Sequence, residues 1–168
     1  MSEADSITLR EVAPADLDAF FAHQLDPEAN RLAAFVGENP RDREVFDARW
    51  ARILASPRNV NRTIVAGGQI VGHVACFPQD GELEVTYWLG REFWGRGLAT
   101  QALQAMLRLV PTRPIHARCA TDNIGSLRVL QNCGFVITGN DRGFAHGRGG
   151  VTEEYLLRLD GTAPAAQA

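Results

Sequence analysis

Alternating and periodic apolar residues divide the first third of the chain into predicted elements. Residues 7–12 alternate and predict a strand, and residues 13–25 carry apolar side chains at helical spacing behind an early proline. The run Asn-Pro-Arg-Asp at 39–42 predicts the start of a further helix, because it offers a cap, a proline at the first position and an acid in the first turn. Residues 26–40 lack a clear period, so we expect a surface connection with a partial helix there.

The middle of the chain predicts an antiparallel meander. Residues 62–77 are rich in strand-forming side chains and are interrupted by Gly67 and Gly68, a pair that suits a two-residue hairpin turn. Residues 82–89 form the next predicted strand after a turn at 78–81. Three consecutive strands joined by such short turns are expected to pair antiparallel.

The last part of the chain alternates between helical and extended patterns. In chain order these are a helix over 98–110, a strand over 115–121, a helix within 123–135, and two strands, 135–139 and 151–159, around a glycine-rich loop at 142–150. Only the helix over 98–110 provides the crossover that a parallel pair of strands requires.

The order of elements predicts a mixed α/β fold rather than a repeating βαβ chain. We expect about seven strands in one mixed, mostly antiparallel central sheet, with helices on both faces. Neither a repeat nor a second domain is indicated, so residues 1–160 are predicted to form a single domain. The small and polar residues 161–168 are predicted to form a flexible C-terminal tail.

Composition narrows the classes of function. The chain has 168 residues, of which 45% are hydrophobic and 22% charged, and its net charge of −3 argues against a general nucleic-acid binder. Its three cysteines, Cys76, Cys119 and Cys133, lie far apart, so neither a metal site nor a disulfide framework is expected. The sequence predicts no signal peptide and no membrane span, and we expect a cytoplasmic protein.

Two glycines mark the junction between the strand at 82–89 and the helix at 98–110. Gly95 and Gly97 permit positive φ, so backbone N–H groups can turn toward one point in front of the helix. A helix N-terminus adds unpaired N–H groups and a partial positive charge. The junction is therefore a predicted anion site, and phosphate is the natural anion.

Two blocks of sequence carry a family resemblance. The first block comprises Tyr87-Trp88, Trp94-Gly95-Arg96-Gly97 and Ala99-Thr100-Gln101-Ala102-Leu103, and the second comprises Asn123, Ser126, Leu130, Gly134 and Phe135. In this order, with one short strand between them, they resemble the GNAT acyl-CoA N-acyltransferases, in particular the ribosomal-protein N-terminal acetyltransferase branch. The resemblance covers nearly the whole chain and implies a three-layer GNAT sandwich that moves an acetyl group from acetyl-CoA to a primary amine by direct attack in a ternary complex.

The resemblance implies where acetyl-CoA binds. Backbone groups of Tyr87, Trp88 and Leu89 would bind the pantetheine arm as an added strand does, and one N–H there could polarise the acetyl carbonyl. The implied cofactor residues also include Trp94, Gly95, Arg96, Gly97, Leu98, Ala99, Thr100, Asn123 and Arg128. Asn123 would bond the arm, Arg96 or Arg128 could pair with a phosphate, and Trp94 could cover the cofactor.

Two positions depart from the family pattern. Glu92 stands where the phosphate loop often begins with Gln or Arg, and Leu130 stands where many members carry the tyrosine that protonates the departing thiolate. The chain either uses another donor or releases the thiolate unprotonated, since a thiol has a pKa of about 8.5.

Candidate catalytic residues follow from the needs of amine chemistry. An ammonium group must lose a proton before its nitrogen can attack. Glu84, on the same strand face as Thr86 and Trp88, is the candidate base. The alternative interpretation is that Glu84 is a solvated strand residue without a catalytic role. Glu82 is a weaker candidate, and His73 is expected to be a core histidine rather than a base. Ser126 either caps its helix or donates a hydrogen bond to the leaving sulfur.

Two other functional interpretations stay open. Cys133 lies near the expected thioester and could support an acyl-cysteine route. Because Leu130 replaces the family tyrosine, the chain could also be a non-catalytic acyl-CoA-binding sensor or interaction domain. The expected partners are acetyl-CoA and a primary amine, with no nucleic acid, membrane or metal, and the sequence allows a homodimer.

Overall fold

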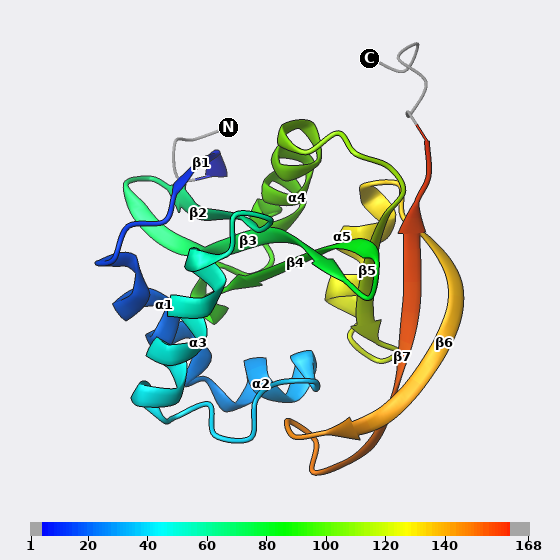
Figure 1. Cartoon of the computed structure of the whole chain (residues 1–168), viewed down its shortest axis with the longest axis horizontal. Helices are drawn as coiled ribbons and strands as arrows, with labels where there is room; N and C mark the ends of the chain where they lie inside the picture. The colour runs from blue at the N-terminus through cyan, green and yellow to red at the C-terminus, as the bar shows by residue number, and fades with distance from the viewer. Residues whose placement is uncertain (1–4, 162–168) are drawn as a thin grey trace.

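A seven-stranded sheet with the order β1-β2-β3-β4-β5-β7-β6 forms the centre of the structure, a computed structural model that describes residues 5–161 (Figure 1). The strands are β1 (Ile7–Glu11), β2 (Val60–Ala66), β3 (Gln69–Gln79), β4 (Glu82–Leu89), β5 (Ile115–Ala120), β6 (Val136–Ala145) and β7 (Gly150–Leu159). All neighbouring strands pair antiparallel except β4 and β5, which are parallel. The predicted meander and the single parallel pair across the crossover are confirmed.

Helices cover both faces of this sheet, as predicted. They are α1 (Asp16–Gln24), α2 (Pro27–Ala33), α3 (Arg43–Ala55), α4 (Leu98–Leu109) and α5 (Ile124–Asn132), with a short 3₁₀ helix at Arg91–Phe93. On one face α4 and α5 pack on the main core, in which Leu103, Met106 and Leu130 are fully buried. On the other face Phe20 of α1 and Phe46 and Trp50 of α3 form a separate aromatic cluster. The result is the predicted three-layer arrangement (Figure 1).

Of three local predictions, two were wrong at their boundaries and one was confirmed. The helix expected to begin at 39–42 begins at Arg43, because Asp42 is its cap and accepts hydrogen bonds from the N–H groups of Glu44 and Val45. The partial helix expected within 26–40 is present as α2, capped by Asp26 with Pro27 at its first position. The first four residues of the predicted loop 142–150 belong to β6, because pairing with β7 extends the strand to Ala145.

Residues 162–168 of the predicted tail lie outside the described residues. Within residues 5–161, no helix combines the length and the apolar character that a membrane span requires.

Candidate active site

β4 and β5 separate where the predicted pantetheine site lies. Among the described residues, their one bridged pair joins Glu84 to His116, whereas β4 stays paired with β3 as far as Leu89. The strands therefore diverge beyond Glu84, and the edge of β4 that would face β5 is left open over Tyr87–Leu89.

The backbone of β4 indicates which residues face this opening. The carbonyl oxygen of Trp88 lies against β3, since a Cβ at Gly72 would be 2.1 Å from it. Neighbouring residues of a strand direct their N–H and C=O groups to opposite edges, so those of Tyr87 and Leu89 face the opening. The Leu89 oxygen already accepts a hydrogen bond from Trp94 Nε1 at 3.0 Å. The groups of Tyr87 are thus placed to pair with an extended ligand.

The N-terminus of α4 has the geometry of an anion site. Gly95 and Gly97 both have φ of +75°, and Gly97 is the cap of α4 without any side-chain cap. A Cβ on either glycine would meet no atom within 4 Å, so the space beside the loop is open. The first turn of α4 carries no acidic residue, and its leading N–H groups have no intrahelical partner. Positive φ, rather than crowding, is the reason for glycine here.

The two arginines predicted to pair with phosphate differ in their surroundings. Arg96, in the glycine turn, lies 3.6 Å from the carboxylate of Asp5 and has its guanidinium 5.9 Å from the ring centroid of Phe93. Arg128 is exposed on α5.

A cleft of about 690 Å³ passes through the opening between β4 and β5. Cys119, Ser126 and Leu130 border it on the α5 side of the sheet, and His73 and Trp88 border it on the side of α1 and α3. Of the predicted site residues, Tyr87, Trp88, Asn123 and Ser126 line this cleft, whereas in the described structure Glu84, Leu89, Arg128 and the segment 94–100 do not. The structure therefore joins the two sequence blocks at one cleft, with the glycine turn outside its walls.

Asn123 is held by protein groups at both ends of its amide. Its Oδ1 accepts a hydrogen bond from the Ser126 N–H at 3.2 Å, which makes Asn123 the cap of α5. Its Nδ2 donates to the Leu32 oxygen of α2 at 3.1 Å. The interpretation of Ser126 as the helix cap was therefore wrong. A bond from Asn123 to pantetheine stays a prediction, and it would require exchange of the Leu32 contact.

A pair of hydroxyl groups lies in the cleft at the start of α5. Tyr87 Oη and Ser126 Oγ are 2.8 Å apart, and either can be the donor. Burial raises the pKa of Tyr87, so its phenol stays protonated at neutral pH. The sequence analysis considered only the backbone of Tyr87. The contact of its side chain with Ser126, in the first turn of α5, depends on how the crossover places α5 beside β4.

Glu84 lies in an ion-pair cluster around Arg118. Arg118 contacts Glu154 at 2.8 Å, Glu84 at 3.3 Å and Asp141 at 3.3 Å. Its hydrogen bond to Glu154, followed by the charge of Glu84, raises the pKa of Arg118. Arg118 and Glu154 line the cleft. Sequence reasoning missed both, since β7 is next to β5 only through the order of strands in the sheet. The solvated-strand interpretation does not describe Glu84, whose side chain is only 13% exposed.

His73 packs as the core histidine that was expected. Its ring centroid is 4.7 Å from that of Phe20 and 4.9 Å from that of Trp50. Burial lowers the pKa of His73 to about 3, so the imidazole is neutral at physiological pH. Glu82, the weaker base candidate, is exposed and lies 3.5 Å from His116.

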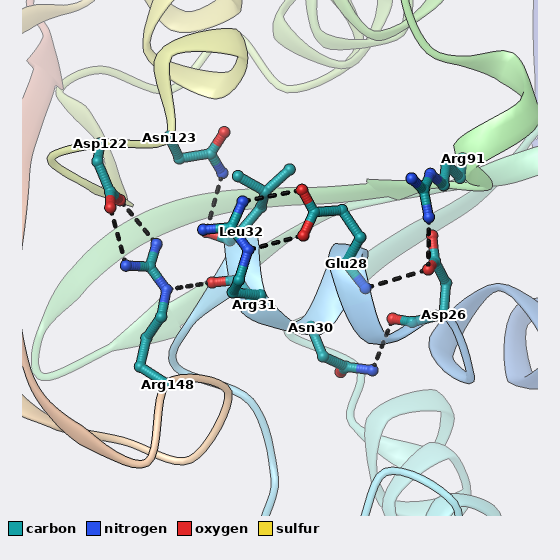
Figure 2. Close-up of polar contacts among 9 residues, drawn as sticks. All are labelled: Asp26, Glu28, Asn30, Arg31, Leu32, Arg91, Asp122, Asn123 and Arg148. Atoms are coloured by element: carbon teal, nitrogen blue, oxygen red, sulfur yellow. Dashed lines mark hydrogen bonds and ion pairs between the residues drawn. The ribbon is translucent and has the colours of Figure 1, made fainter.

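A polar clamp fixes α2 beside the cleft (Figure 2). Arg148, in the turn between β6 and β7, binds both oxygens of Asp122 and donates to the Arg31 oxygen. At the other end of α2, Arg91 contacts Asp26 at 3.3 Å. The turn comes so close that a Cβ on Gly147 would lie 2.1 Å from a backbone oxygen of α2. Segments distant in sequence thus hold one wall of the cleft in place.

Comparisons with known proteins identify the family of this chain. A family described as Acetyltransferase (GNAT) domain matches residues 6–136. An uncharacterized N-acetyltransferase p20 of Bacillus licheniformis is 28% identical over 165 residues, covering 92% of this chain and 93% of the relative.

Solved structures share the fold at lower sequence identity. RimJ of Mycobacterium smegmatis, in complex with CoA-disulfide, has a TM-score of 0.80 and 19% identity over 96% of this chain and 86% of that one. Spermidine N-acetyltransferase of Vibrio cholerae, in complex with CoA and spermine, has a TM-score of 0.79 and 14% identity over 92% of this chain and 95% of that one.

Proposed function

Since this chain belongs to the GNAT acetyltransferase family and is thus an enzyme that uses acetyl-CoA, we propose that it acetylates a primary amine by direct attack in a ternary complex. A protein N-terminus or a small-molecule amine is the acceptor. The observation that carries the proposal is the cleft through the opening between β4 and β5, which is lined by residues on both faces of the sheet.

The residues present fit acetyl-CoA. The leading N–H groups of α4 would bind the pyrophosphate, and Arg96 or Arg128 would pair with a phosphate oxygen. The open edge of β4 at Tyr87–Leu89 would bind the pantetheine amides as a missing strand does. Trp94 would cover the arm at the point where β4 ends.

The carboxylates on the other face would serve the acceptor. An alkylammonium group has a pKa of about 10, so it must lose a proton before its nitrogen can form the new C–N bond. Glu84 is our proposed acceptor of that proton, directly or through water. Arg118 positions Glu84 at 3.3 Å and keeps two further carboxylates as partners, so it would remain paired if Glu84 became protonated.

The hydroxyl pair would serve the leaving sulfur. When the C–S bond breaks, its electron pair ends on sulfur, and Ser126 Oγ–H is our proposed hydrogen-bond donor to it. Tyr87 Oη, 2.8 Å away, would donate to Ser126 in turn. Leu130 lies one turn after Ser126 on α5 and is fully buried, so the hydroxyl that α5 offers at this point of the cleft is that of Ser126.

Cysteine chemistry argues for direct attack. Burial raises the pKa of Cys133 to about 11 and that of Cys119 to about 11. Their thiolates are therefore scarce at neutral pH, which disfavours an acyl-cysteine route.

Timed release of free thiol from acetyl-CoA, with and without amines, tests the proposal. The panel contains peptides, amino acid amides, polyamines and aminoglycosides. We expect thiol release to depend on an amine and to equal the acetylated amine formed. Tight acetyl-CoA binding without turnover on any amine would instead favour the sensor interpretation.

A further inference from the structure

A second groove lies between β1 and α4, away from the cleft between β4 and β5 (Figure 1). Its volume is about 430 Å³, and none of the described residues lines both cavities. One wall is formed by Ile7 and Leu9 of β1 and by Arg62 of β2. The other wall is formed by one face of α4, at the spacing i, i+3, i+4 and i+7, and by the residue that follows: Gln101, Gln104, Ala105, Arg108 and Leu109.

The unpaired edge of β1 opens beside this groove. Among the described residues β1 is the first strand of the sheet and pairs with β2 alone. The Ile7 N–H donates to Gln101 Oε1 at 3.3 Å, so it points away from β2. In an antiparallel pair the backbone groups of alternate residues point to the same edge, so the N–H and C=O of Leu9 also point away from β2. Within residues 5–161 no hydrogen bond beyond the sheet reaches these two groups of Leu9.

Two guanidinium groups give this groove a positive charge. Arg62 points to the α4 side of the sheet, because Ile64, two residues further along β2, is part of the core beneath α4. Arg62 donates to a backbone oxygen at 2.8 Å, Arg108 is exposed on α4, and neither pairs with a carboxylate of the described residues. Glu11 lies opposite Arg62 on β1 but is not part of the wall, and no acidic residue of the described chain lines the groove.

The edge and the charges together indicate the kind of partner. An unpaired strand edge binds the backbone of an extended peptide, and guanidinium groups bind carboxylates. A single anion would use the arginines but not the edge of β1. We propose that this groove binds an extended acidic segment of another protein as an added strand beside β1, with carboxylates on alternate residues facing Arg62 and Arg108. The interaction is separate from acetyl transfer and does not depend on it.

Fluorescence anisotropy of a labelled peptide tests the groove. The probe is Ser-Glu-Thr-Glu-Thr-Glu-Ser with fluorescein at its N-terminus, which places every carboxylate on one face of a strand. We expect saturable binding to the wild-type protein, with the same affinity when excess CoA is present. The absence of saturable binding at millimolar protein would overturn the proposal. Displacement of the probe by CoA would also overturn it, because the carboxylates would then occupy the phosphate site.

Two N-methylated forms of the probe separate strand addition from attraction by charge. One form carries N-methyl groups on its glutamates and the other on its threonines, so each keeps every charge but loses the N–H groups of one edge. Only the form whose methyl groups face β1 should bind more weakly, by about 5-fold or more, because its hydrogen bonds to the strand are lost. Equal affinities of all three peptides would exclude an added strand.

Arg108→Glu and Arg52→Glu are a matched pair of variants. Both reverse one exposed charge on a helix, but Arg52 lines neither cavity. Arg108→Glu should weaken probe binding roughly 3–30-fold, since an ion pair is replaced by a repulsion. Arg52→Glu should change it less than about twofold. Equal losses in the two variants would mean that only the net charge of the protein matters, and would overturn the site.

Amide hydrogen exchange of the wild-type protein tests the same site without any variant. The Leu9 N–H is open in the free protein, whereas the Thr8 N–H points toward β2 by the alternation along β1. Saturating unlabelled peptide should therefore slow the exchange of Leu9 more than that of Thr8. An unchanged Leu9 rate at saturation would remove the peptide from the edge of β1, whether or not the enzyme acetylates amines.

Discussion

At the scale of single residues, Asp16 shows how a buried charge is stabilised. Its side chain is 3% exposed. One carboxylate oxygen accepts from Arg10, the Ala13 N–H and Thr63, and the other accepts from a second nitrogen of Arg10. These bonds, that from Arg10 foremost, hold the pKa of Asp16 at about 2, below its ordinary value of 3.8. The carboxylate therefore joins β1, α1 and β2 as long as it is ionised.

The first prediction concerns stability and pH. A lowered pKa in the folded state gives stability that is present above pH 4 and is lost as pH falls from about 4 to about 2. Asp16→Asn should reduce the free energy of unfolding by about 2–4 kcal/mol at pH 7 and flatten its pH dependence in that window. Urea denaturation between pH 2 and 7 measures both.

Asp18→Asn is the matched control on the same helix. Asp18 is 81% exposed and pairs with Arg43 at the surface, so we expect little change in stability. Equal losses in the two variants would contradict the role of burial.

The second prediction concerns the proposed base. Glu84→Gln should leave acetyl-CoA affinity within a few-fold and lower turnover about 10²–10⁴-fold at neutral pH, with a smaller loss at high pH, where more amine is already deprotonated. Arg118 keeps Glu154 and Asp141 as partners, so the fold should persist. The pH dependence of kcat/KM is the measurement.

Two further variants test which carboxylate is the base. Glu82→Gln changes an exposed carboxylate on the same face of β4 and should retain the wild-type profile. A pH-dependent loss in Glu154→Gln rather than Glu84→Gln would move the base to β7.

At the scale of elements, the N-terminus of α4 depends on two residues with positive φ. Gly95→Val should weaken acetyl-CoA binding beyond detection by calorimetry, because a β-branched residue disfavours φ of +75° and the N–H groups would turn away. The fold should persist, since a Cβ at this position meets no other atom.

Gly81→Val provides the same strain elsewhere. Gly81 has φ of +81° in the turn between β3 and β4 and also has open space around it. This variant should lose stability but keep its acetyl-CoA affinity. Wild-type affinity in Gly95→Val would remove the phosphate site from the glycine turn.

At the scale of the whole molecule, the clamp connects the β6–β7 turn to α2 and to the loop before α5. Arg148→Ala breaks the bidentate pair with Asp122 and the contact with Arg31. We expect faster amide hydrogen exchange in α2 and a KM for the amine raised about 3–30-fold, with acetyl-CoA affinity little changed, because charge-assisted bonds of this kind contribute about 1.5–3 kcal/mol before solvent screening. Hydrogen exchange and steady-state kinetics measure these effects.

Arg158→Ala is the control for the clamp. Arg158 pairs with Asp160 two residues along, so its loss should affect neither α2 nor the amine. Unchanged exchange in α2 of Arg148→Ala would show that apolar contacts alone hold this helix.

The sequence by itself determined the elements and the glycine turn. Apolar periodicity, Gly67-Gly68 and the pair Gly95 and Gly97 are local signals, because backbone conformation depends mainly on near neighbours. The same local rules predicted a helix start at Asn39. The helix is instead capped by Asp42, three residues later. The two motif blocks and the single parallel crossover were sufficient to predict the mixed sheet, whereas the cofactor end of the site stays a prediction.

Only the tertiary structure decided which side chains meet. Glu154 reaches Arg118 because β7 inserts between β5 and β6, and Tyr87 reaches Ser126 because α5 packs across the diverging strands. The contact between Asn123 and Leu32 spans 91 positions in the chain. Such partners depend on strand order and register, which no local pattern encodes, and the side chains that line the cleft are brought together in this way.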